Sequence, residues 1–220
     1  MRSEDRKVKY KAIIFDLDGV ICFTDEYHYL AWKALADSMG VYFDREINNR
    51  LRGVSRMESL EIVLERYCGP ALSDDEKVAL ATKKNDMYRE SLAQMSPADL
   101  SDEVKATLDA LRANGALLAI GSSSKNAPFI LHQIGLEGYF DAISDGNNIV
   151  RSKPDPEVFL KAAQFLGLEP KDCLVVEDAV SGAEAGHAGG FEVACVGDAA
   201  LAGVGDYNMK SFSELLEITK

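Results

Sequence analysis

The chain has 220 residues, of which 24 are lysine or arginine and 36 are aspartate or glutamate, giving a net charge of −12 at pH 7. This balance disfavours a general attraction to DNA, RNA or anionic lipid, so an anionic ligand must be held by a few placed cations or a metal ion. A hydrophobic content of 47% is enough for a sizeable core in one large domain or two unequal ones.

The sequence contains no stretch near the roughly 18 consecutive apolar residues of a membrane span. The opening residues, MRSEDRKVKY, hold no apolar segment that could act as a signal peptide. We therefore expect a cytoplasmic protein, acting as a monomer, with no membrane or nucleic-acid partner. The cysteines are far apart and form no CxxC motif, so free thiols and no zinc site are expected at Cys22, Cys68, Cys173 and Cys195.

The first predicted strand spans residues 8–16, where the sequence VKYKAIIFD is rich in Val, Ile and Phe. About seventy residues with helical signals follow it, and capping boxes begin at Ser55 and at Ser73. This part of the chain is predicted to be an all-helical insert, with helices at 26–40, 55–69 and 73–95.

From Pro97 onward, predicted strands alternate with predicted helices. Such alternation implies right-handed crossovers and a parallel sheet covered on both faces, and the continuously apolar strands agree with that burial. We predict an α/β core made of residues 1–23 and 96–220, with a helical cap domain at 24–95. The predicted strands lie at 116–121, 141–145, 173–177 and 192–197. Helices are predicted at 101–115, 179–189 and 211–219. Two further helices are predicted, one that ends at Gly135 and one that begins with Asp155 as its cap and Pro156 at its first position.

Polar side chains follow four of these strands. Ligands of open parallel sheets bind outside the carboxyl ends of the strands, so these residues are expected to converge. Like charges about 4 Å apart repel by about 4 kcal/mol at an effective dielectric constant of 20, so four carboxylates need a cation, and Mg²⁺ prefers oxygen and phosphate ligands. The converging residues are Asp16, Asp18, Ser122 to Asn126, Lys153, Glu177 and Asp178.

Asp16 and Asp18 are two residues apart in an extended segment, so they face the same side at about 7 Å. This spacing suits in-line phosphoryl transfer, with one carboxylate as nucleophile and the other handling the proton of a hydroxyl. Gly19 allows the chain to turn away tightly. Each motif alone has a simpler explanation as a turn, a helix start, a linker or a solvated pair. Their joint placement at successive strand ends favours the catalytic interpretation.

The segments FDLDGV, GSSSKN, SKPDP and VVED, in this order, resemble the four signature regions of the haloacid dehalogenase superfamily of phosphotransferases. Within it, TDEYHYLAWKALA, LRGVSRMESL and KKNDMY resemble the β-phosphoglucomutases. The resemblance implies a Rossmann-like core with a helical cap. It also implies an isomerase of carbohydrate metabolism that interconverts β-D-glucose 1-phosphate and glucose 6-phosphate through a phosphoaspartate, a glucose 1,6-bisphosphate and Mg²⁺.

By this resemblance, Asp16 is the nucleophile and Asp18 the general acid and base. The implied magnesium ligands are Asp16, the Asp18 backbone carbonyl, Glu177 and Asp178. The implied phosphate ligands are Ser122 and Lys153 for the transferring group, and Arg56, Ser124, Lys125 and Asn126 for the other. The implied cap residues are Thr24 and His28 at the hinge, Gly53, Val54, Ser55 and Lys84 along the sugar, and Trp32 in support.

Simpler interpretations stay open for several of these residues. Taken alone, Arg56 and Lys84 are solvated helix charges, Trp32 is core packing, and His28 is a hydrogen-bonded helix residue. Phe23 stands where many members of the superfamily have an acidic residue. Three alternative functions also remain: a sugar-phosphate phosphatase of the same superfamily, a signalling receiver domain, and a non-catalytic sugar-phosphate binding module.

Overall fold

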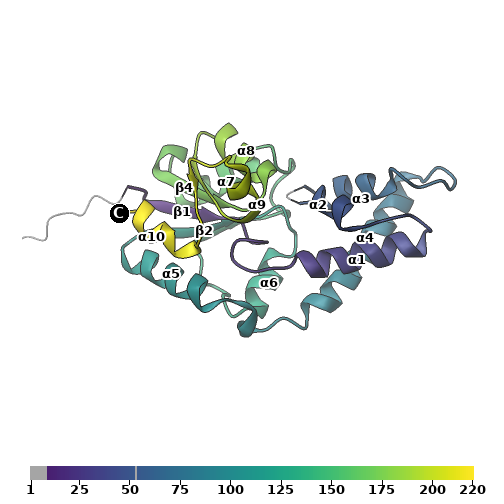
Figure 1. Cartoon of the computed structure of the whole chain (residues 1–220), viewed down its shortest axis with the longest axis horizontal. Coiled ribbons are helices and arrows are strands. Elements are labelled where there is room, and N and C mark those ends of the chain that lie inside the picture. Colours follow the sequence, from purple (N-terminus) through teal and green to yellow (C-terminus); the bar gives the residue numbers. More distant parts are fainter. Residues whose placement is uncertain (1–8, 53) are drawn as a thin grey trace, which may run out of the picture.

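The computed structural model describes residues 9–52 and 54–220. A parallel sheet with the strand order β3-β2-β1-β4-β5-β6 lies at its centre (Figure 1). Because β1 lies between β2 and β4, the loop after β1 is flanked by the loops that follow both neighbours. The strands are β1 (Ala12–Phe15), β2 (Leu117–Gly121), β3 (Ala142–Ser144), β4 (Cys173–Glu177), β5 (Glu192–Cys195) and β6 (Tyr207–Asn208).

Helices cover both faces of the sheet (Figure 1). Successive residues of a strand point to opposite faces, so Ile13 and Phe15 of β1 pack on one side and Ala12 and Ile14 on the other. The first side packs against α5 (Asp102–Ala113), α6 (Ala127–Gln133) and α10 (Leu215–Ile218), and the second against α7 (Glu157–Leu166), α8 (Val180–Ala188) and α9 (Gly197–Ala202). The predicted α/β fold with a parallel sheet is confirmed.

Of the α-helices between β1 and β2, the first four form a separate group, here called the helical unit, while α5 packs on the sheet. They lie beside the sheet, at one end of the molecule in Figure 1. Buried apolar side chains such as Trp32, Leu35 and Leu60 give this unit a hydrophobic cluster of its own. Its helices are α1 (Asp25–Ser38), α2 (Arg45–Asn49), α3 (Arg56–Leu64) and α4 (Asp74–Leu92).

The predicted capping boxes at Ser55 and Ser73 are present, and they start α3 and α4. Short elements were not predicted, namely α2, α9 and β6, because a segment of two to six residues shows too little periodicity. The α2 helix begins because the carboxylate of Asp44 accepts a hydrogen bond from the Ile47 amide at 2.9 Å.

Some predicted boundaries differ from the structure. Described β1 begins at Ala12, and the predicted start at Val8 lies outside the described residues. The α7 helix begins at Glu157 rather than Pro156, although the Asp155 carboxylate accepts from the Glu157 amide as a cap would. The predicted last helix divides into a 3-10 turn at Phe212–Glu214 and the short α10.

The four cysteines have free thiols in the structure, with Cys68 exposed and the other three buried. Within residues 9–52 and 54–220, every helix is too short or too polar to cross a lipid bilayer.

The core of the helical unit gives a stability prediction. Leu35 is fully buried on α1, whereas Leu30 on the same helix is 52% exposed. Leu35→Ala is expected to lower the free energy of unfolding by about 2–5 kcal/mol, because it removes packed methyl groups and leaves a cavity. Leu30→Ala is the matched control, expected to change it by about 0.5 kcal/mol or less. Urea unfolding followed by circular dichroism measures both, and equal effects would contradict the assignment of Leu35 to the core.

Candidate active site

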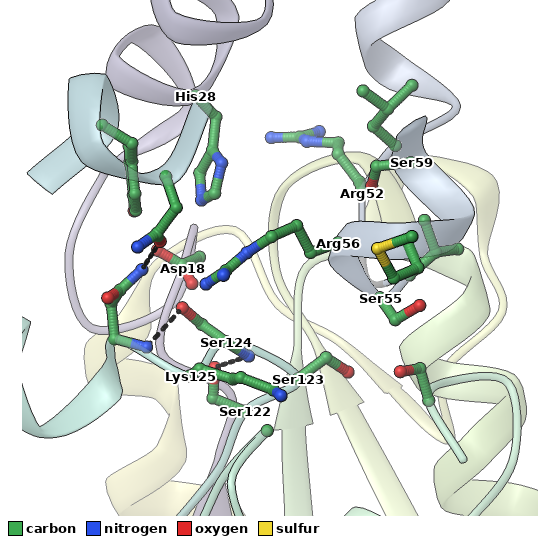
Figure 2. Close-up of a pocket in the computed structure, with 18 of the residues that line it drawn as sticks. Asp18, His28, Arg52, Ser55, Arg56, Ser59, Ser122, Ser123, Ser124 and Lys125 are labelled. Carbon is green, nitrogen blue, oxygen red and sulfur yellow. Dashed lines mark hydrogen bonds between the residues drawn. The ribbon is translucent and has the colours of Figure 1, made fainter. Parts of the chain in front are cut away.

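A cavity of about 570 Å³ lies between the carboxyl edge of the sheet and the helical unit (Figure 2). Its floor is formed by the loops after β1, β2, β3 and β4, and its roof by α1, α3 and α4. All the predicted site residues that the structure describes line this cavity, apart from Thr24 and Lys153. Gly53 lies outside the described residues. The fold therefore brings together side chains that are more than 160 positions apart in the sequence.

The floor is dominated by buried carboxylates. Oxygen atoms of Asp16, Glu177 and Asp178 all lie within 4.8 Å of one another, and each of these residues is at most 6% exposed. Burial raises the pKa of Asp16 well above its usual range, and the neighbouring carboxylates oppose its ionisation further. Burial and Glu177 raise the pKa of Asp178 to about 7. Three acids packed this closely oppose one another's ionisation, which a bound cation would relieve.

Lys153 supplies the nearest positive charge. Its Nζ donates to Asp16 Oδ1 at 2.5 Å and also to Glu177. Burial lowers the pKa of Lys153, but the two carboxylates outweigh this effect and raise it, so the ammonium stays charged. Lys153 and Arg52, whose Nη2 lies 3.4 Å from Asp178 Oδ2, face three acids, so a further cation can be held, and a set of hard carboxylate oxygens fits Mg²⁺. The expected contribution of the Asp18 backbone carbonyl stays a prediction.

Two glycines make the close approach of these acids possible. A Cβ atom at Gly182 on α8 would lie 1.9 Å from Glu177 Oε1, where the carboxylate now sits. Glu177 is held there by the amides of Asp178 and Ala179, which donate to Oε2 at 2.9 and 3.0 Å. Gly19 has a positive φ of 88°, and a Cβ there would lie 2.2 Å from Asp178 Oδ2. The backbone thus holds the Glu177 carboxylate in place and leaves room for that of Asp178.

Asp18 is not part of the acid cluster. The hydroxyl of Thr24, the residue just before α1, donates to Asp18 Oδ1. Burial raises the pKa of Asp18, and the Thr24 hydrogen bond opposes that rise. The candidate proton-handling group is therefore tied to the segment that joins the sheet to the helical unit.

The loop after β2 is ordered by its own side chains (Figure 2). The Ser124 amide donates to Ser122 Oγ, and the Asn126 amide donates to Ser124 Oγ, both at 3.2 Å. Lys125 also lines the cavity. These donors and hydroxyls suit an anion, as predicted for this loop.

Arg56 faces this loop from the roof. It is the first residue of α3, and Figure 2 shows its side chain reaching across the cavity toward Ser124. Within the described part of the chain, no carboxylate lies within ion-pair distance of its guanidinium. Burial lowers the pKa of Arg56 from its ordinary value. An unpaired, half-buried guanidinium beside a cavity is a candidate anion ligand rather than a solvated helix charge.

The roof also holds a buried lysine. Lys84 is 3% exposed, so its interpretation as a solvated charge is wrong. Its Nζ lies 2.9 Å from His28 Nδ1 and over the rings of Trp32 and Tyr88. Burial lowers the pKa of Lys84 to about 7, and burial together with Lys84 lowers the pKa of His28 well below its usual range. Trp32 is both a core residue of the helical unit and part of the cavity wall.

Two of the remaining roof residues have clear local tasks. Ser55 lines the cavity, but its hydroxyl accepts from the Glu58 amide at 3.3 Å and caps α3. Val54 contributes an apolar wall.

Sequence reasoning missed several residues of the cavity wall. Asn85 accepts a hydrogen bond from Asn126 Nδ2 at 2.9 Å, which joins α4 to the loop after β2. It directly follows Lys84, so the KKNDMY segment held the signal for it. Arg52 directly precedes Gly53, but nothing local predicts its partners across the cavity. The missed wall residues include Asn48, Arg52, Ser59, Asn85 and Tyr88.

Gly182 gives a prediction for the acid cluster. Gly182→Ala is expected to weaken Mg²⁺ binding by about tenfold or more, because the new methyl group displaces the Glu177 carboxylate. Glu184→Ala, at an exposed position on the same helix, is the control and is expected to bind Mg²⁺ as the wild type does. Titration calorimetry measures the affinities. An unchanged affinity in Gly182→Ala would show that Glu177 is not a ligand.

Comparison with known proteins gives consistent findings. The family model described as haloacid dehalogenase-like hydrolase matches residues 10–190. A β-phosphoglucomutase of Bacillus subtilis is 41% identical over 190 residues, covering 85% of this chain and 83% of that protein. A fructose-1-phosphate phosphatase of Escherichia coli, YqaB, is 31% identical over 185 residues, covering 84% and 95%.

Solved structures agree with the fold. The crystal structure of a β-phosphoglucomutase from Clostridium difficile matches with a TM-score of 0.88 and 34% sequence identity, covering 94% of this chain and 93% of that one. The chain thus resembles both a mutase and a phosphatase over most of its length.

Proposed function

The chain belongs to the haloacid dehalogenase-like hydrolase family, and on this premise we propose that it is a β-phosphoglucomutase. The proposed reaction interconverts β-D-glucose 1-phosphate and glucose 6-phosphate by phosphoryl transfer. Residues 24–95 are proposed to act as the cap of the active site. The partners are small sugar phosphates, with glucose 1,6-bisphosphate as the intermediate.

One observation carries the proposal: the cavity has two separate anion-binding poles. Lys153, which bonds Asp16, and Ser122 mark the first pole at the floor, whereas Arg56, which reaches from the roof toward Ser124, and Lys125 of the loop after β2 mark the second. A phosphatase acting on a single phosphate needs the first pole only. A mutase must also hold the phosphate that is not being transferred, and the second pole is suited to this task.

In the proposed cycle, Asp16 begins as an acyl phosphate. The free hydroxyl of the sugar phosphate loses its proton to Asp18 as its oxygen attacks the phosphorus atom, and the bond to Asp16 breaks to give the bisphosphate. The bisphosphate reorients, and Asp16 takes up the other phosphoryl group while Asp18 returns the proton. A bound Mg²⁺ would neutralise the charge of the phosphoryl oxygens next to Asp16, Glu177 and Asp178.

The remaining residues of the chain have supporting tasks in this proposal. Lys153 holds the transferring phosphoryl group, since its Nζ already lies beside Asp16. Thr24 begins the proposed cap, and its hydroxyl donates to the Asp18 carboxylate. The position of Asp18 therefore depends on the position of the cap. A cavity roofed by helices keeps water from the acyl phosphate, and a mutase requires this exclusion.

Substitutions of Asp16 and Asp18 are expected to have different effects on catalysis. Asp16→Asn should lower kcat by about 10³-fold or more and form no covalent phosphate adduct, because the nucleophile is lost. Asp18→Asn should lower kcat by about 10²- to 10⁴-fold while the adduct on Asp16 still forms from the bisphosphate. Steady-state kinetics and intact-protein mass spectrometry measure these effects. Activity surviving in Asp16→Asn would rule out this residue as the nucleophile.

A sugar-phosphate phosphatase is the second candidate function, favoured by the similarity to the Escherichia coli enzyme. Phosphorus NMR of β-glucose 1-phosphate with enzyme, Mg²⁺ and a trace of glucose 1,6-bisphosphate distinguishes the two. We expect the glucose 6-phosphate signal to grow at the expense of the substrate. Release of inorganic phosphate without glucose 6-phosphate would replace the mutase assignment by the phosphatase.

A further inference from the structure

Arg52 lies in the loop between α2 and α3, and its guanidinium contacts carboxylates from three separate segments. Nη2 pairs with Asp25 at the start of α1 and lies 3.4 Å from Asp178 Oδ2. Nη1 lies 2.5 Å from Oδ2 of Asp198, which belongs to α9. Two of these three partners are in the sheet part of the molecule. The side chain therefore bridges the helical unit and the sheet.

The backbone of Arg52 is attached to the sheet part as well. Ser181 Oγ on α8 donates to the Arg52 carbonyl oxygen at 3.3 Å. Residue 52 is thus held by its side chain and by its main chain, on the same side of the cavity as β4 and α8. This double attachment distinguishes it from an exposed surface ion pair.

Through its contact with Asp178, Arg52 adds positive charge to the acid cluster. Lys153 reaches Asp16 and Glu177, and among the described residues Arg52 is the basic residue within ion-pair distance of Asp178. A divalent cation bound by the cluster would lie near this guanidinium, and like charges repel strongly at short range in a buried site.

We propose that Arg52 is a positioning residue that docks the helical unit onto the sheet through Asp178, and that the same contact weakens Mg²⁺ binding at the cluster. Arg52 and the metal ion compete for the Asp178 carboxylate, so Mg²⁺ binding weakens the contact between the helical unit and the sheet. This proposal rests on the metal site proposed above, but it does not depend on whether the enzyme is a mutase or a phosphatase.

The charge effect is tested by titration calorimetry with Mg²⁺ alone. Arg52→Gln is expected to bind Mg²⁺ about three- to tenfold more tightly than the wild type, because the opposing charge is gone. Arg52→Lys keeps a positive charge but cannot hold all three carboxylates, so its Mg²⁺ affinity is expected to lie between those of the wild type and Arg52→Gln. Arg50→Gln is the matched control two residues away, since, of the residues in 9–52 and 54–220, Arg50 forms its ion pair with Glu65 alone. A purely structural role would not tighten metal binding.

The docking effect is tested by small-angle X-ray scattering on the same proteins without metal. Both Arg52 variants are expected to show a larger radius of gyration than the wild type, since neither glutamine nor lysine can span three carboxylates. Arg50→Gln is expected to match the wild type. An unchanged radius in Arg52→Lys, the milder substitution, overturns the docking role even if Arg52→Gln does not fold.

The outcomes separate this proposal from the proposed function. A wild type that binds no Mg²⁺ overturns the metal site, and this inference with it. Equal Mg²⁺ affinity in the wild type and in Arg52→Gln overturns the inference alone and leaves the metal site standing.

Discussion

The structure depends on the neutralisation of acidic side chains that the fold buries together. Carboxylate oxygens of Asp16, Glu177 and Asp178 lie within 4.8 Å of one another at the ends of two adjacent central strands. Lys153, delivered from the loop before α7, bonds two of them and is itself almost fully buried. A buried charge without a partner is costly, so this lysine and these acids stabilise one another's positions. The arrangement favours the binding of a metal cation by the carboxylates and of a phosphoryl group by Lys153.

The helical unit covers this charged edge and so forms a cavity over it. Its contribution is not only to cover the sheet, because it also supplies cations. Arg56 and Lys84 are held in or near the cavity with lowered pKa values, and Arg52 reaches the acid cluster itself. An acidic protein thereby places several of its basic side chains where an anionic substrate would bind. In the proposed function, Arg56 on the roof holds the second phosphate, whereas Lys153 holds the phosphoryl group that is transferred.

Much of the fold was predictable because it depends on local signals. The apolar strands, the capping boxes at Ser55 and Ser73 and the alternation after Pro97 identified an α/β sheet with a helical insert. Short elements such as α2 and β6 were missed, since their few residues carry little periodicity. Lys84 could not be assigned from its position on a helix, because its burial depends on Trp32 and Tyr88, which belong to other turns and another helix.

The sequence alone determined which residues follow the strands of a parallel sheet, and therefore that Asp16, Lys153, Glu177 and Asp178 meet at one edge. This follows because the side chains at strand ends are placed by the backbone direction, which local patterns fix. Only the tertiary structure decided which carboxylates Lys153 bonds, that Thr24 holds Asp18, and that Arg52 reaches Asp178. The Lys153 and Arg52 contacts join segments far apart in the chain, and the Thr24–Asp18 contact depends on how the loop between β1 and α1 folds, which no local pattern records.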